Sequence, residues 1–123
     1  MLAHVSIGVS DIKRAGEFYD SVLQPLGYKR LYDSEGALGY GDKDPALWLL
    51  ASGGTVKPDM KSGLHFCFTA NAQTDVDAFY AAGVKQGGKD NGKPGIRKDY
   101  SPNYYAAFVI DPDGYRLEAF CGK

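Results

Sequence analysis

Hydrophobic and polar residues alternate in a short run near the start of the chain, and a longer amphipathic stretch follows it. Residues 4–9 read His-Val-Ser-Ile-Gly-Val, and this alternation predicts a β-strand. The next apolar positions recur at spacings of three and four, which predicts a helix with one buried face; they are Ile12, Ala15, Phe18, Val22 and Leu26. Ser10 or Asp11 can cap the start of this helix, and Pro25 with Gly27 ends it.

Three further strands are predicted in the first half of the chain. They span residues 28–33, 37–40 and 46–51, and turn-forming sequences separate them. The segment 52–63 is rich in Gly, Pro and Lys and has no periodicity, so we interpret it as a connector. The order of elements up to this point is therefore β-α-β-β-β.

The second half of the chain repeats this pattern. When the sequence is shifted by 61 positions, His4 falls on His65, Phe18 on Phe79, Tyr19 on Tyr80 and Gly27 on Gly88. The repeat predicts a strand at 65–69, a helix, and strands at 96–98, 104–110 and 115–121, with a tight hairpin at 111–114.

The second helix is predicted from its start signal and its apolar spacing. Residues 74–77 read Thr-Asp-Val-Asp, which is similar to a capping box, and Gly87 with Gly88 ends the helix. Val76, Phe79 and Val84 are expected on its buried side. We interpret the glycine-rich segment 83–95 as a solvated loop.

These elements predict an α+β fold of two tandem βαβββ modules. Each module is expected to form a curved mixed sheet with its helix on the convex side, so that the two sheets surround a concave cup. A single domain spans 1–123, with module one at about 1–52, a linker at about 53–63 and module two at about 64–121.

Composition and charge exclude several classes of function. The 14 basic and 15 acidic residues give a formal net charge of −1, which predicts no nucleic-acid partner. We expect no membrane span, because no apolar run approaches the roughly 20 residues required. The start of the chain lacks a secretory signal, so we expect a cytoplasmic protein with reduced Cys67 and Cys121.

Strand alternation places candidate metal ligands on the concave side. Cys67 shares a strand face with His65, and Arg116, Glu118 and Phe120 share a face of the last strand. A single strand histidine is usually a structural residue, but His4 and His65 occupy equivalent positions of the repeat. Two histidines and one carboxylate suit a divalent first-row metal, so we predict a site formed by His4, His65 and Glu118.

The first module offers no fourth ligand. Aligning residues 42–45 with 111–114 places Leu49 opposite Glu118, and the neighbours of Leu49 are also apolar. Three ligands leave coordination positions open, as a catalytic metal requires.

Four residues near this site are candidates for substrate binding. Cys67 either contacts substrate or metal, or serves as a small buried apolar residue. Arg116 either binds an anionic group or lies at the solvent end of its strand. Tyr104 and Tyr105 follow a loop at the mouth of the cup, where side chains either recognise substrate or pack.

The chain resembles the vicinal oxygen chelate superfamily, which includes glyoxalase I, bleomycin-resistance proteins, fosfomycin-modifying transferases and extradiol dioxygenases. The resemblance rests on the His4 and His65 strands, on residues 18–28 (Phe-Tyr-Asp-Ser-Val-Leu-Gln-Pro-Leu-Gly-Tyr) and on residues 111–118 (Asp-Pro-Asp-Gly-Tyr-Arg-Leu-Glu). It covers the whole chain and implies a glyoxalase-like fold. His4, His65 and Glu118 match the ligand positions of the superfamily, with Glu118 as the catalytic carboxylate.

The resemblance also implies a function. We expect a small metal-dependent lyase, transferase or dioxygenase in which Mn, Fe, Ni or Zn acts as a Lewis acid on a substrate with two neighbouring oxygens. Pairing into a homodimer would let His4 of one subunit share a site with His65 and Glu118 of the other. The alternatives are a metal-free binding protein of the bleomycin-resistance type and a lactoylglutathione lyase, although Leu49 replaces the further ligand of that lyase.

Overall fold

The computed structural model of the protein describes residues 1–54 and 61–123 and contains two four-stranded mixed sheets with two α-helices. The first module comprises β1 (Val5–Val9), α1 (Ile12–Leu23), the short 3-10 helix η1 (Gln24–Leu26), β2 (Lys29–Asp33), β3 (Ala37–Gly41) and β4 (Pro45–Ala51). The second comprises β5 (Phe66–Thr69), α2 (Gln73–Lys85), β6 (Lys89–Ile96), β7 (Tyr105–Ile110) and β8 (Arg116–Cys121).

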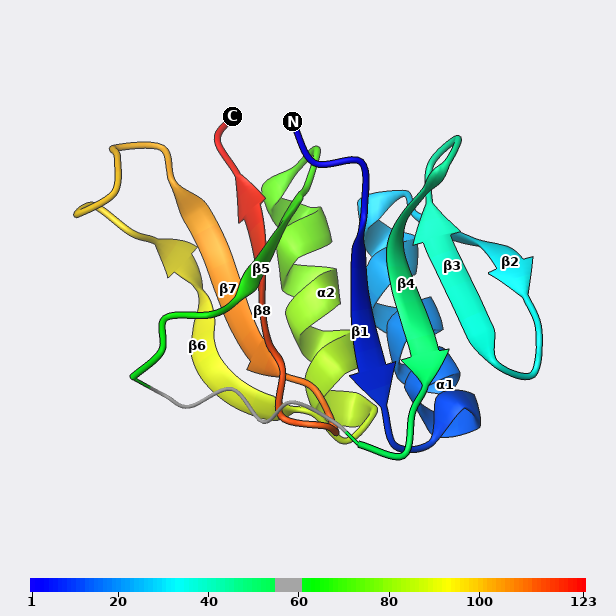
Figure 1. Ribbon diagram of the computed structural model, residues 1–123. Helices are drawn as coiled ribbons and strands as arrows, with labels where there is room; N and C mark the ends of the chain where they lie inside the picture. Colours follow the sequence, from blue (N-terminus) through cyan, green and yellow to red (C-terminus); the bar gives the residue numbers. More distant parts are fainter. Residues whose placement is uncertain (55–60) are drawn as a thin grey trace.

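The two sheets have the same topology. Their strand orders are β1-β4-β3-β2 and β5-β8-β7-β6, and the first strand of each module runs parallel to the last. Both helices lie behind the sheets, and α2 is visible between β5 and β1 in the middle of the molecule (Figure 1). This arrangement confirms the predicted α+β class and the two tandem modules. No helix among the described residues is long and apolar enough to cross a membrane.

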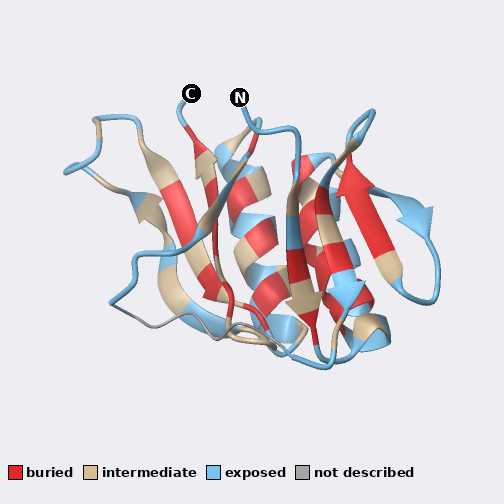
Figure 2. Cartoon of the chain, viewed as in Figure 1, coloured by how far each residue is buried: buried red, intermediate tan, exposed pale blue. Residues whose placement is uncertain are grey.

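The core lies between the sheets and the helices, as the red segments facing one another in Figure 2 show. On α1, Asp11 is the cap, since its carboxylate accepts a hydrogen bond from the Arg14 backbone N–H at 3.1 Å. The predicted stripe is buried at Ala15, Phe18 and Val22. The helix ends through η1 and Gly27, whose φ of 87° lies in the left-handed region.

The start and the buried face of α2 differ from the prediction. The helix begins at Gln73, and its N-cap, Ala72, has no side-chain cap. Val84 is 44% exposed, and Gly83 faces the sheet instead. A Cβ on Gly83 would lie 2.9 Å from a methyl carbon of Val109, so the close approach of α2 to β7 requires glycine there.

The segment interpreted as a solvated loop forms most of a strand. β6 occupies Lys89–Ile96 and pairs with β7, whereas the sequence predicted a strand only at 96–98. The pairing register shifts on both sides of Gly92, which has a φ of 152°. These bulges remove the alternation on which the sequence-based prediction depends.

The buried carboxylate of Asp111 joins the second module to the first. Asp111 is 4% exposed and accepts hydrogen bonds from the Tyr19 hydroxyl and from the backbone N–H groups of Asp113 (2.9 Å) and Tyr115 (2.8 Å). Burial raises the pKa of the Asp111 carboxyl, and burial together with the Asp111 charge raises that of Tyr19 well above its ordinary value. The β7–β8 hairpin is thereby fixed to α1.

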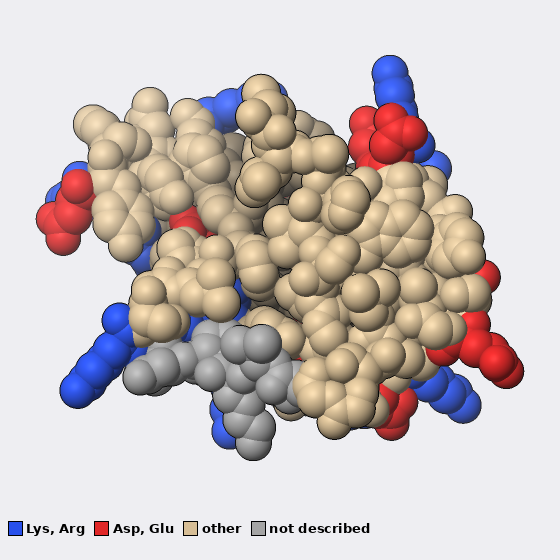
Figure 3. All heavy atoms as spheres, in the orientation of Figure 1, with Lys and Arg blue, Asp and Glu red and all other residues tan. Residues whose placement is uncertain are grey.

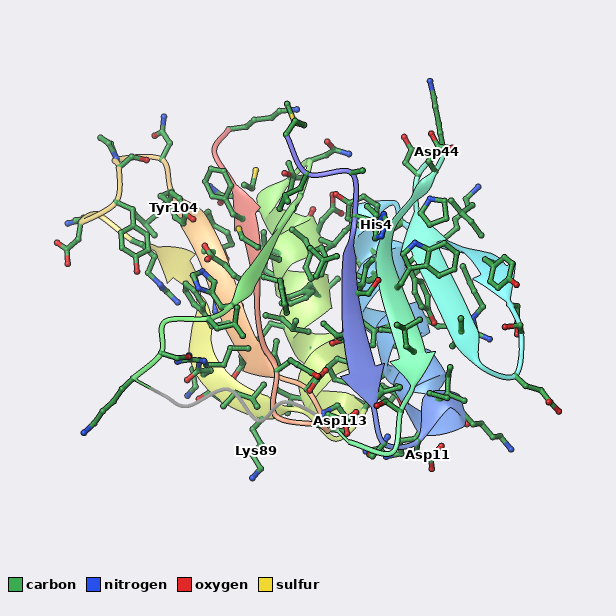
Figure 4. All side chains as sticks on the ribbon, viewed as in Figure 1. His4, Asp11, Asp44, Lys89, Tyr104 and Asp113 are labelled. Carbon is green, nitrogen blue, oxygen red and sulfur yellow. The ribbon has the colours of Figure 1, made fainter. Side chains whose placement is uncertain are left out.

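Two further contacts at the same end of the molecule connect the modules. The Tyr115 hydroxyl donates to the Gly8 carbonyl at 2.8 Å, and the Ser10 hydroxyl donates to the Asp113 carboxylate at 2.6 Å. Figure 4 places Asp113 close to Asp11 at the start of α1. The hairpin at 111–114 therefore contacts both β1 and α1.

Removal of the Tyr19 hydroxyl should destabilise the whole chain. We expect Tyr19→Phe to lower the free energy of unfolding by about 1–3 kcal/mol, because a buried carboxylate loses a donor. Exposed Tyr32 provides the control, and Tyr32→Phe should change the value by less than about 0.5 kcal/mol. Urea unfolding followed by circular dichroism measures both changes.

The effect of Tyr19→Phe should depend on pH in a defined direction. Since the folded pKa of Asp111 is raised, the contribution of this carboxyl to stability is complete below its unfolded pKa and is lost as the pH rises through the folded value. The ionised form needs the Tyr19 donor most, so the loss in the variant should be larger at neutral than at acidic pH. An equal loss at both would contradict a role in stabilising the carboxylate.

Candidate functional site

His65 and Glu118 meet on the open face of the second sheet. Glu118 lies in the middle of β8 and is 2% exposed, and His65 immediately precedes β5. His65 Nε2 lies 3.0 Å from Glu118 Oε1, and His65 Nδ1 lies 3.1 Å from the Gly63 carbonyl oxygen. Strand alternation thus predicted two side chains that do converge.

The second oxygen of Glu118 is bound by Tyr104. The Tyr104 hydroxyl donates to Glu118 Oε2 at 2.6 Å, and desolvation, followed by this bond, raises the pKa of the hydroxyl. The Tyr104 ring stacks on Phe120, with centroids 4.1 Å apart, and meets Tyr100 edge-on at 4.9 Å. Both carboxylate oxygens are therefore held by side chains of the same module.

Cys67 is the third neighbour of Glu118. It pairs in register with Glu118 across β5 and β8, and parallel partners share a sheet face. Desolvation, followed by the Glu118 charge, raises the pKa of the Cys67 thiol to about 12. The residue is exposed at the edge of the sheet, so the alternative of a buried apolar filler is wrong. Its thiol is fully protonated at neutral pH.

Arg97 and Phe108 belong to the same face and were not selected from the sequence. Phe108 pairs with Glu118 across β7 and β8, and its ring lies 6.4 Å from that of His65. The Arg97 guanidinium lies 5.4 Å from the Phe108 ring and donates to the Lys93 carbonyl at 2.6 Å. Phe108 could have been found from the sequence, because the hairpin at 111–114 sets the pairing register that places Phe108 opposite Glu118.

Two other predicted residues occupy different positions. The Tyr105 hydroxyl donates to the Asp77 carboxylate of α2 at 2.5 Å, so Tyr105 is directed toward the helix side and does not join the group around Glu118. The Arg116 guanidinium donates to the Ser62 hydroxyl at 3.2 Å from a half-buried position on β8. Arg116 lies two residues from Glu118 and shares its strand face.

His4 does not approach this group within one chain. It precedes β1 as His65 precedes β5, which agrees with the 61-residue repeat. Figure 4 shows His4 beside β1 and β4 and Tyr104 on the far side of the second module. Among the described residues, no group of three or more His, Cys, Asp and Glu side chains is placed to hold a metal ion.

The residue equivalent to Glu118 in the first module is Trp48, not Leu49. Ser6 pairs with Trp48 across β1 and β4, as Cys67 pairs with Glu118 across β5 and β8. Leu49 is fully buried on the helix side. The sequence alignment was one residue out of register because the turns before the two last strands differ in length. Trp48 meets Tyr32 edge-on, with centroids 5.2 Å apart, so this face of the first sheet is aromatic.

A family model connects this architecture to known proteins. The model describes the Glyoxalase/Bleomycin resistance protein/Dioxygenase superfamily and matches residues 1–119. The chain belongs to this superfamily. The match confirms the resemblance inferred from the sequence. A comparison with curated proteins gives no match.

Solved structures of the superfamily share the fold. A glyoxalase/bleomycin resistance protein from Albidiferax ferrireducens T118 is 28% identical, with a TM-score of 0.87 and 98% of each chain covered. A putative glyoxalase from Bacillus halodurans is 24% identical, with a TM-score of 0.73 and coverage of 98% of this chain and 95% of that one. The fosfomycin resistance protein FosX from Listeria monocytogenes is 13% identical, with a TM-score of 0.73 and coverage of 100% and 93%.

His65 and Glu118 fit part of the divalent metal site that the superfamily implies. An imidazole nitrogen and a carboxylate oxygen lie 3.0 Å apart, which is a suitable donor pair for a first-row metal. The third predicted ligand, His4, lies on the other module. Within one chain, two of the three predicted ligands therefore lie together and the third lies elsewhere.

The Glu118 charge should control the reactivity of the Cys67 thiol. We expect Glu118→Gln to lower the pKa of Cys67, because the variant removes the carboxylate charge that raises it and leaves desolvation and the Tyr104 hydrogen bond, which act in opposite directions. The thiolate fraction at mildly alkaline pH rises, so alkylation by iodoacetamide should accelerate by about threefold or more. The rate is measured by mass spectrometry of the modified protein.

Two controls isolate this effect. Cys67→Ala reports any background from buried Cys121, and Glu17→Gln removes an exposed carboxylate on α1. An alkylation rate in Glu118→Gln equal to that of the wild type would show that the charge of Glu118 does not act on the thiol.

Proposed function

We propose that the protein is a metal-dependent enzyme that acts on a small molecule with two neighbouring oxygen atoms. In this proposal a divalent metal (Mn, Fe, Ni or Zn) is bound by His65 and Glu118 of one copy and by His4 of a second copy. The contact between His65 Nε2 and Glu118 Oε1, 3.0 Å long on the open face of the second sheet, is the observation that supports it most. The proposed reaction class is further supported by the superfamily to which the chain belongs, which includes glyoxalases and dioxygenases.

The open face of the molecule supports pairing between two copies. Large apolar side chains remain exposed there: Tyr32 is 49%, Leu50 40% and Tyr100 63% exposed. Figure 3 shows charged side chains mainly around the outline of this face and uncharged ones across its middle. A second copy that lays its first sheet over this second sheet would bury such surface and carry His4 toward Glu118.

The side chains around Glu118 have separate roles in the proposed reaction. When bound, the metal supplies a Lewis acid that polarises the two substrate oxygens. Glu118 is the catalytic carboxylate, and Tyr104 holds its Oε2 so that Oε1 stays directed toward His65. Cys67 and Tyr104 line the position of the substrate.

Positive charge beside this position suggests an anionic substrate. Arg97 lies over Phe108, and Arg116 shares the strand face of Glu118. None of the ion pairs among residues 1–54 and 61–123 joins Arg97 to a carboxylate. A guanidinium that is not neutralised by a neighbour can bind a carboxylate or phosphonate group of the substrate.

A second candidate function is metal-free binding of a small molecule. The observation that favours it is that each Glu118 oxygen already has a hydrogen-bond partner in the chain, His65 at Oε1 and Tyr104 at Oε2. We do not propose lactoylglutathione lyase activity, because Trp48 stands at the position equivalent to Glu118 and supplies no further ligand.

Metal content distinguishes the two candidates. We expect freshly purified protein to carry stoichiometric metal and the apo protein to gain roughly 10 °C in melting temperature at a hundredfold excess of metal over its Kd. His65→Ala and Glu118→Gln should lose both, whereas Asp44→Ala, a change in an exposed turn, should retain them. Protein without metal and without metal-induced stabilisation would favour the binding protein.

Mixing two variants tests whether the site is shared. His4→Ala and His65→Ala should each lack metal, but their mixed dimer should regain one intact site of two, formed by the unmodified His4 of one copy and the unmodified His65 of the other. Isothermal titration with Zn²⁺ measures the recovery. If the mixture binds no metal although mass spectrometry shows mixed dimers, His4 does not act across copies.

A further inference from the structure

The crease between the two modules contains a cavity of about 380 Å³. Its walls come from the residues around β1, the start of β4, the chain after η1, and the whole length of β5. The cavity opens beside the group around Glu118, because His65 and Cys67 form part of its wall. It is otherwise built from residues that have no role in the proposed metal site.

The cavity coincides with an incomplete part of the core. Four hydrophobic residues that pack against the core yet stay only partly buried line it together: Val5, Tyr28, Phe66 and Phe68. By contrast, Phe18 of α1 and Phe79 of α2 are fully buried in the core. Apolar surface left in contact with water at this place would be covered by an apolar ligand.

The strand edges at the crease are not paired with each other. β1 is hydrogen-bonded to β4 alone and β5 to β8 alone, and no ladder in the described part of the chain joins the two sheets. A cavity bounded by such edges offers backbone donors and acceptors along an otherwise apolar wall. This combination of apolar lining and a few polar groups is typical of small-molecule sites, which also prefer the boundaries between structural units.

The residues that line the cavity indicate the charge, the polarity and the size of a ligand that would fit it. Among the described residues that line it there is no Lys, Arg, Asp or Glu, so the cavity favours an uncharged molecule. Aliphatic side chains and aromatic rings both line it, and the rings of Tyr28 and Phe68 lie 6.2 Å apart at a tilted angle. The volume is at the lower end of the range of about 300–1,000 Å³ for ligand pockets.

We propose that the crease cavity binds a neutral, largely aromatic molecule of two or three rings. This site differs from the open face around Glu118, which carries two arginines and a carboxylate and so selects charged or chelating groups. Binding in the crease completes the core between the modules, and it requires neither a metal nor Glu118.

Fluorescence titration with N-phenyl-1-naphthylamine, a neutral two-part aromatic probe, tests the proposal. We expect saturable binding to one site per chain with a rise in emission. Val5→Trp places a large ring in the cavity and should weaken binding by tenfold or more. The matched control, Val84→Trp, introduces the same ring on the exposed side of α2 and should bind as the wild type does.

A milder variant covers the case in which Val5→Trp does not fold. Phe68→Leu keeps an apolar side chain but removes one ring, and it should weaken binding by about threefold to tenfold. Circular dichroism and urea unfolding establish that each variant is folded before its affinity is compared.

Several results would overturn the proposal, and each is separate from a failure of the metal site. Probe binding that is absent, unsaturable or unchanged in both cavity variants would exclude this site. If probe binding is lost when the protein concentration is raised into the range where the protein dimerises, the occupant of the cavity is a second copy of the chain. Loss in Glu118→Gln would place the probe on the open face. Retained binding in metal-free protein and in Glu118→Gln supports the crease site even if no metal binds.

Discussion

The buried carboxylate of Asp111 is the constraint around which the two modules are arranged. A charge-bearing group that is 4% exposed must be satisfied internally, and its three donors come from α1 and from the β7–β8 hairpin itself. The hairpin sets the start of β8, and β8 carries Glu118. Tyr115, the residue after the hairpin, reaches the Gly8 carbonyl of β1. A single polar network thus fixes the relation between the modules and the position of the candidate catalytic carboxylate.

Much of the fold could be predicted from the sequence because two periodicities are strong. The helix stripe of α1 and the 61-residue repeat both survive in the structure, and His4 and His65 precede equivalent strands. The prediction was wrong where the residues carry no local pattern of the element that they form. Glycine bulges conceal β6, and the face of α2 turns toward Gly83 because only glycine permits its contact with Val109. Turn length could not be read well enough to separate Trp48 from Leu49.

The parts of the candidate site that depend on the alternation of side chains along a strand could be predicted from the sequence. Residues on one face of β5 and β8 lie close together because the two strands are parallel and paired in register. His65, which precedes β5, therefore reaches Glu118. Tyr104 and Arg97 lie at the ends of β7 and β6, and their roles depend on how a loop closes, which has no sequence period. The combination that results is an acid with a hydrogen-bond partner at each oxygen, next to aromatic rings and a cation. Groups held in place by such contacts need less ordering when a ligand binds.

The lack of a hydrogen-bonded ladder between β1 and β5 has a consequence for how copies of this chain relate to one another. The modules are held together by helix packing and by a few side-chain bonds, such as those of Asp111, Tyr115 and Asp113. The Tyr19–Asp111, Tyr115–Gly8 and Ser10–Asp113 bonds join one module to the other, so an exchange of modules between neighbouring copies would use the same side chains. In evolutionary terms, a duplicated half-domain of this kind can move between one-chain and two-chain assemblies without rebuilding its core.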